Sequence, residues 1–173
     1  METIKIQNTN LGEMRGRFIT EIELESLHIS GCRMTLENED ILELSVNRFI
    51  FVNNLVEVLV TEALQLRVSE LALIVNNTFQ HLQLKSFTDV APLTKSSAME
   101  IKSNSVENFE SGFLIINQNW KNLEIENLRL EKRCDCHLSI FSTDELEVIN
   151  NDTVIDTLVK NTFCIGENMS GNF

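Results

Sequence analysis

Proline and glycine are scarce in this chain, which has one proline and six glycines among 173 residues. These two residues usually mark turns, so another residue has to end the secondary structure here. Long apolar runs are also missing: the longest, such as Leu71 to Val75, have about five residues, far short of the roughly 20 that cross a bilayer as a helix. We therefore expect no membrane insertion by this segment.

Basic residues are outnumbered, with 14 Lys and Arg against 26 Asp and Glu, a formal net charge of −12. Nucleic-acid binding takes most of its affinity from Lys and Arg, and anionic membrane surfaces attract the same residues. The balance argues against both partners. The glutamates are scattered singly, as on a solvated strand face that repulsion keeps soluble.

Asparagine takes the role of the missing turn residues. Three apolar runs, "FIFVNN", "ALIVNN" and "FLIINQN", stop at asparagine. Aligned on Asn53, Asn76 and Asn117, they lie 23 and 41 residues apart, close to one and two units of about 20. Internal repeats of this length indicate a solenoid.

A second series has similar spacing. An apolar–polar–apolar triplet recurs every 17 to 24 residues, and alternation with period two indicates a strand with one buried and one wet face. The abundance of Val, Ile and Phe favours strands over helices through residue 130. The segments are IKIQN, IELES, LELSV, LQLRV, LQLKS, MEIKS and LEIEN.

Short strands without hairpin turns or helical connectors predict coils stacked in parallel. We predict an all-β solenoid over residues 1–130, a right-handed parallel β-helix of about six coils, since parallel crossovers are right-handed as a rule. An irregular leucine-rich-repeat solenoid is the alternative, but it supplies fewer apolar points than the coil at 64–82. That coil has two alternating apolar runs, Leu64/Leu66/Val68 and Leu71/Leu73/Val75, and then Phe79.

Stacking explains the choice of asparagine. Like residues lie over like in such a stack, so a turn Asn can hydrogen-bond its amide to the Asn one rung away. Asn also tolerates the left-handed backbone of a tight corner. We predict a turn ladder of Asn53, Asn76 and Asn117; the alternative is that Asn is simply a common loop residue.

Residues 131–173 have a different character, and we predict that they form a disulfide-linked cap and tail. The open end of a solenoid needs covering, and a capping box at Ser142 and Glu145 starts a helix, so the cap is expected to be partly helical. Cys32 lies about a hundred residues upstream and is expected to be free. The disulfide candidates are Cys134, Cys136 and Cys164, with free buried thiols as one alternative and a zinc site that adds His137 as another.

Three Asn-x-Ser/Thr sequences, at Asn76, Asn151 and Asn168, are candidate glycosylation sites. With a disulfide cap, they predict a secreted or cell-surface protein; the cytoplasm is the alternative. Asn76 cannot both stack inside a ladder and carry a glycan, so the other two are the better candidates. The first ten residues lack the features of a signal peptide, so an extracellular chain is expected to be part of a longer precursor.

The "CDCHL" motif at 134–138, followed by Phe141 and by a cysteine about thirty residues later, resembles the C-terminal cap of extracellular leucine-rich-repeat proteins. The coils before it, especially "NNTFQHLQLKSFTDV", are similar to those of arthropod extracellular proteins that join right-handed β-helix coils to such a cap. The likeness covers about residues 42–165 and implies a non-catalytic ectodomain. One late cysteine, Cys164, stands where that cap usually has two, so its partner among the two motif cysteines is left open.

We predict a non-enzymatic extracellular module that presents an acidic surface to a protein or matrix partner, with no catalytic residue, metal or cofactor. No Gly-x-Ser-x-Gly motif or phosphate-binding glycine loop occurs. One alternative is a carbohydrate-active β-helix enzyme, for which Glu124 and Glu126 form a carboxylate pair, although strand alternation alone predicts that spacing. Another is a fragment of a receptor ectodomain with no independent function.

Overall fold

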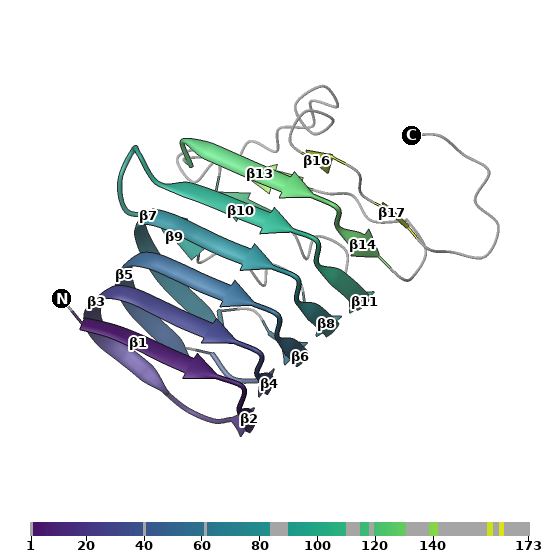
Figure 1. The fold of residues 1–173 in the computed structure, drawn as a ribbon, viewed down its shortest axis with the longest axis horizontal. Helices are drawn as coiled ribbons and strands as arrows, with labels where there is room; N and C mark the ends of the chain where they lie inside the picture. Colours follow the sequence, from purple (N-terminus) through teal and green to yellow (C-terminus); the bar gives the residue numbers. More distant parts are fainter. Residues whose placement is uncertain are drawn as a thin grey trace.

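Within the described residues the chain is all-β, and its parallel strands stack as a solenoid (Figure 1). The predicted fold class is therefore confirmed. No helix occurs in this described part. The computed structural model describes residues 2–39, 41–60, 62–83, 90–109, 115–117, 120–130, 139–141, 159–160 and 163–164.

Two parallel sheets run along the solenoid and a short third sheet lies beside them. The first contains β1 (Glu2–Gln7), β3 (Ile19–Ser30), β5 (Leu42–Val52), β7 (Leu64–Val75), β10 (Ala98–Lys102), β13 (Asn122–Glu126) and β16 (Val159–Lys160), with β9 (Val90–Pro92) paired to β7. The second contains β2 (Asn10–Met14), β4 (Arg33–Leu36), β6 (Leu55–Leu59), β8 (Thr78–Leu82), β11 (Ser105–Phe109), β14 (Arg129–Leu130) and β17 (Phe163–Cys164). The third pairs β12 (Ile115–Asn117) with β15 (Ser139–Phe141).

In the described residues, six strands of the first sheet each pass through a tight corner into a strand of the second: β1, β3, β5, β7, β10 and β13. In Figure 1 the first-sheet strands stack from purple β1 to green β13, and the short second-sheet strands continue them at the right. Among the described strands, the steps from β1 to β13 make five turns, which stack six rungs. Like positions on successive rungs therefore lie over one another, as the repeat predicted.

The long strands of the first sheet bend in the middle. The pairing of β5 with β7 is in register from Leu42 to Val46, shifts there, and resumes with Arg48 opposite Leu71. Beyond β7 the two halves separate, because β9 pairs with the first half and β10 pairs with the second. The bend thus divides each coil into two strand directions before the tight corner turns it into the second sheet.

The core lies between the sheets and is filled by aromatic and aliphatic side chains. Phe49 and Phe51 are buried, and the ring centroids of Phe51 and Phe79 are 6.4 Å apart. Trp120 is also buried, and Phe79 pairs with Val106 on the next rung.

One part of the predicted core is wrong. The first run of β7, Leu64 to Val68, points its leucines and valine inward, but Leu71, Leu73 and Val75 are half-buried on the outside, and Ala72 and Ile74 fill the core. Because this run is apolar at every position, its alternation cannot tell the two faces apart. Register with the buried phenylalanines of β5 sets the phase.

The predicted boundary at residue 130 stays a prediction, because most of the cap lies outside the described residues. Both main sheets nevertheless gain a short strand later in the chain, since β16 pairs with β13 and β17 pairs with β14. The capping box also lies outside the described residues, as do Cys134, Cys136, His137, Asn151 and Asn168, while Cys164 belongs to β17.

Candidate interaction surface

The tight corner between the two sheets has the same design on every rung. One residue adopts a positive φ, and the residue after it comes directly before the second-sheet strand. A positive φ is uncommon outside glycine, and asparagine tolerates it best. The positive-φ residues are Asn8, Gly31, Asn53, Asn76, Ser103 and Asn127, with φ between 51° and 63°.

The residues that follow three of these corners form the Asn ladder: Asn54, Asn77 and Asn104, all buried. Asn54 N donates to Asn77 Oδ1 and Asn77 N donates to Asn104 Oδ1, both at 2.9 Å. Each side-chain Nδ2 donates in turn to a carbonyl of the preceding rung, as Asn77 does to Phe51 O at 2.8 Å. These amides therefore satisfy buried backbone groups that a corner would otherwise leave unpaired.

The predicted turn ladder is thus one residue out. Asn53 and Asn76 do turn the corner, with φ of 57° and 55°, but both are exposed, and the residue after each makes the inter-rung bonds. The sequence predicts that one asparagine both turns the corner and bonds to the next rung. In the structure two consecutive asparagines divide these roles. Asn117 lies in strand β12 of the third sheet rather than at this corner. The doubled asparagine in "VNN" is the signal that could have located the ladder.

The Asn ladder ends on the N-terminal side at Cys32, a free and buried cysteine. Cys32 N donates to Asn54 Oδ1 at 2.9 Å, as an asparagine at that place would. Its thiol lies 3.6 Å from Ile6 O and 3.4 Å from Ser30 O. The thiol therefore takes the place of the missing amide, with weaker donation.

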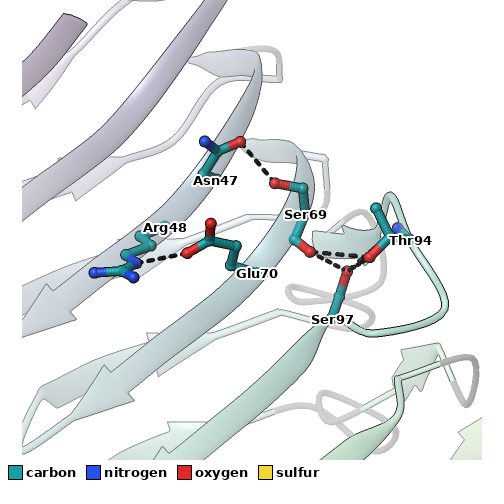
Figure 2. Close-up of polar contacts among 6 residues, drawn as sticks. All are labelled: Asn47, Arg48, Ser69, Glu70, Thr94 and Ser97. Carbon is teal, nitrogen blue, oxygen red and sulfur yellow. Dashed lines mark hydrogen bonds and ion pairs between the residues drawn. The ribbon is translucent and has the colours of Figure 1, made fainter. Parts of the chain in front are cut away.

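The bend in the middle of the long strands has its own polar contacts, shown in Figure 2. Ser69 Oγ donates to Asn47 Oδ1 at 2.7 Å, and Ser69 O accepts from Ser97 Oγ at 2.9 Å and from Thr94 Oγ1 at 3.0 Å. Ser97 is fully buried and its hydroxyl also lies 2.8 Å from Val68 O. This corner is held by hydroxyls, which bond to main-chain carbonyls and to other side chains, rather than by stacked amides.

Between the bend and the tight corner lies a flat outer surface, which we call the flat face. It is formed by the outward side chains of β1, β10, β13 and the second halves of β3, β5 and β7. Its middle column, in register from the first rung to the sixth, is Lys5, His28, Ile50, Leu73, Glu100 and Glu124. The column nearer the tight corner is Gln7, Ser30, Val52, Val75, Lys102 and Glu126, and the column nearer the bend is Thr3, Ser26, Arg48, Leu71, Ala98 and Asn122.

The centre of the flat face is apolar. Five aliphatic side chains from two neighbouring strands stand next to one another there and are only half-buried. A contiguous apolar patch on a soluble surface usually marks a contact with another molecule. The five are Ile50, Val52, Leu71, Leu73 and Val75.

The C-terminal end of the flat face is acidic. Lys102 Nζ lies 2.6 Å from Glu124 Oε2 and 2.9 Å from Glu100 Oε2. The hydrogen bond to Glu124, and then that to Glu100, raises the pKa of Lys102 above its ordinary value. Glu126 pairs with Lys102 in the strand register, so this end of the face carries three glutamates and one lysine. The Glu124 side chain is 59 % exposed and can meet a partner.

At the edge of the flat face and on the second sheet, arginines pair with glutamates along the surface. Arg48 Nε donates to Glu70 at 2.7 Å at the bend, and Arg33 Nε donates to Glu57 at 2.6 Å across two rungs. Hydrogen bonds from Arg33 and then from Thr35 lower the pKa of the Glu57 carboxyl. Because these arginines are neutralised by glutamates, the remaining glutamates give the surface its negative charge.

Comparison of the chain with protein-family models, with curated proteins and with solved structures finds no match in any of the three. In the described part of the chain, no three His, Cys, Asp or Glu side chains lie close enough to hold a metal ion. No helix with the length and hydrophobicity for crossing a membrane occurs among these residues.

Proposed function

We propose that this chain is a non-enzymatic extracellular binding module and that the flat face is the surface that binds a protein or matrix partner. The observation that carries this proposal is the apolar patch at the centre of an otherwise polar surface. Stacked rungs make such a surface flat and hold its side chains at fixed spacing, which is how solenoids usually bind extended partners. The acidic end around Glu124 adds selectivity, since charge complementarity excludes wrong partners.

The extracellular part of the proposal draws support from Asn76. The sequence suggested a conflict between pairing in a ladder and carrying a glycan. Because Asn77 makes the ladder bonds, Asn76 is left exposed at a corner, with Thr78 two residues later. A glycan there would project away from the core. The resemblance to arthropod β-helix proteins with a C-x-C cap points to the same compartment.

Peptide mapping of the full chain, secreted from a eukaryotic host behind an added signal peptide, tests the compartment. We expect a glycan on Asn76 and none on Asn53, which has the same corner geometry but is followed two residues later by Leu55. In the matched variant Leu55→Thr, Asn53 should acquire one. An unmodified Asn76 together with free thiols at all four cysteines would contradict an extracellular protein.

Binding to a panel of purified collagen, laminin and fibronectin, measured by surface plasmon resonance, tests the surface. We expect Leu73→Asp to abolish the binding that the wild-type chain shows and Glu23→Lys, on the outside of β3 away from the flat face, to preserve it. A Leu73→Asp variant that binds as the wild type does would contradict the proposal. Cleavage of neutral or uronate polysaccharides that depends on Glu124 and Glu126 would instead show an enzyme.

A further inference from the structure

We propose that one partner of the flat face is a second copy of this chain, packed face to face across a two-fold axis. This rests on the proposed function, because it takes the flat face as the binding surface. The inference comes from the order of residues along the middle column of the face, which begins with Lys5 and His28, continues with two aliphatic residues and ends with two glutamates.

The middle column shows this order most clearly. Lys5 and His28 occupy the first two rungs, Ile50 and Leu73 the third and fourth, and Glu100 and Glu124 the fifth and sixth. Lys5 is exposed, and the Glu124 side chain is 59 % exposed. At about 4.8 Å between strands, the two charged ends lie roughly 24 Å apart with the apolar patch between them. Such a surface is complementary to itself when it is turned end to end.

A two-fold axis that runs parallel to the strands, between β5 and β7, gives this arrangement. It places each rung opposite the rung equally far from the other end, as an isologous interface requires. Lys5 then faces Glu124 of the second copy, His28 faces Glu100, and Ile50 faces Leu73. An axis along the stack would instead set Glu124 near its own copy, where like charges repel.

The two flanking columns agree with the same axis. Near the tight corner, Val52 faces Val75, while Ser30 faces Lys102 and Gln7 faces Glu126. Near the bend, Leu71 faces Arg48, whose charge is already paired with Glu70 at 2.7 Å. No column brings two groups of like charge together, and the five aliphatic side chains gather around the axis.

The face is small for a permanent dimer. Six strands at about 4.8 Å and five residues at about 3.3 Å give roughly 500 Å² of face per copy, or about 1,000 Å² in all. Specific interfaces begin near this size, and those at the lower limit are usually transient. We therefore expect a reversible, concentration-dependent dimer with micromolar affinity that weakens as salt screens the charged ends.

Sedimentation velocity of the full chain over a range of concentrations tests the proposal with a charge exchange. We expect Lys5→Glu and Glu124→Lys each to raise the dimer Kd by about tenfold, and the double variant to restore it to within about threefold, because the exchanged charges face each other again. Leu73→Asp should give a monomer. Glu23→Lys, the same charge change as Glu124→Lys but outside the flat face, should dimerise like the wild type.

Two results would overturn the second copy as partner: a wild-type monomer at every concentration up to millimolar, or single variants that weaken the dimer without restoration in the double variant. Far-UV circular dichroism and thermal unfolding of each variant identify any that fails to fold, and Lys5→Gln and Glu124→Gln then replace it with smaller expected losses. The proposed function can stand when the dimer fails. A monomer that still binds a matrix protein through Leu73 would keep the flat face as a binding surface.

Discussion

The two polar corners of this solenoid hold the chain by different means. At the tight corner, one positive-φ residue and one buried asparagine recur, and each asparagine bonds to the rung on either side of it. At the bend, unlike residues hold successive rungs: Asn47 and Ser69 follow the paired valines Val46 and Val68, and the hydroxyls of Thr94 and Ser97 bond to main-chain carbonyls, to main-chain N–H groups and to each other. The tight corner therefore repeats the same residue type and the same bonds, whereas the bend uses different residues on successive rungs.

The difference shows what repetition contributes. In the Asn ladder the loss of one amide affects three rungs, because every interior asparagine both accepts from the rung before and donates to the rung after. At the bend, each hydroxyl serves its immediate neighbours, and Ser69 O keeps one donor if another is removed. We expect the tight corner to be the more cooperative of the two, and three substitutions test this.

The largest effect is expected for Asn77→Ala. The substitution leaves Asn54 N and Phe51 O without their partners at 2.9 and 2.8 Å in a buried corner. At about 1–3 kcal/mol for each buried group left unsatisfied, we expect a loss of roughly 3–5 kcal/mol in the free energy of unfolding, measured with urea. The adjacent control Asn76→Gly keeps the positive φ and should change it by less than about 1 kcal/mol. Equal effects would show that the ladder is no more than a turn.

A smaller effect is expected for Ser97→Ala at the bend. It removes the hydroxyl from Val68 O and Ser69 O, but Ser69 O retains Thr94 Oγ1 at 3.0 Å. We expect a loss of about 1–2 kcal/mol in urea unfolding, and less than about 0.5 kcal/mol for the exposed neighbour Ser96→Ala. A cost for Ser97→Ala that reaches that of Asn77→Ala would remove the contrast between the corners.

The smallest effect is a gain, expected for Cys32→Asn. An amide at this place can donate to Ile6 O, where the thiol now lies 3.6 Å away, and so extend the Asn ladder by one rung. We expect a stabilisation of about 1 kcal/mol, measured as a rise in the urea midpoint. Cys32→Ala should lower it. A loss for the asparagine variant greater than that for alanine would mean that position 32 has no room for the amide.

The sequence was sufficient to predict the period, the parallel stacking and the role of asparagine as a stop, because repeated residues reflect repeated environments. It could not set the phase of Leu71 to Val75, since a run that is apolar on both faces carries no alternation. The match of Asn76 with Asn117 was misleading for a related reason: apolar runs that end in Asn occur both at the tight corner and in the third sheet. The order of charges on the flat face depends on the strand register, which places Lys5 and Glu124 at opposite ends of one column.

The number of residues in a coil varies from rung to rung, but the hydrogen bonds at the tight corner keep the same arrangement. Successive residues of the Asn ladder are 23 and 27 positions apart, yet the main-chain N of each donates to the next Oδ1 at 2.9 Å in both steps. The additional residues are therefore accommodated elsewhere in the coil. A segment that starts at one ladder asparagine and stops just before the next is therefore a unit of growth. Duplicating this segment would lengthen the solenoid by one rung. Shortening the part of the coil that lies away from the tight corner would leave the Asn ladder unchanged.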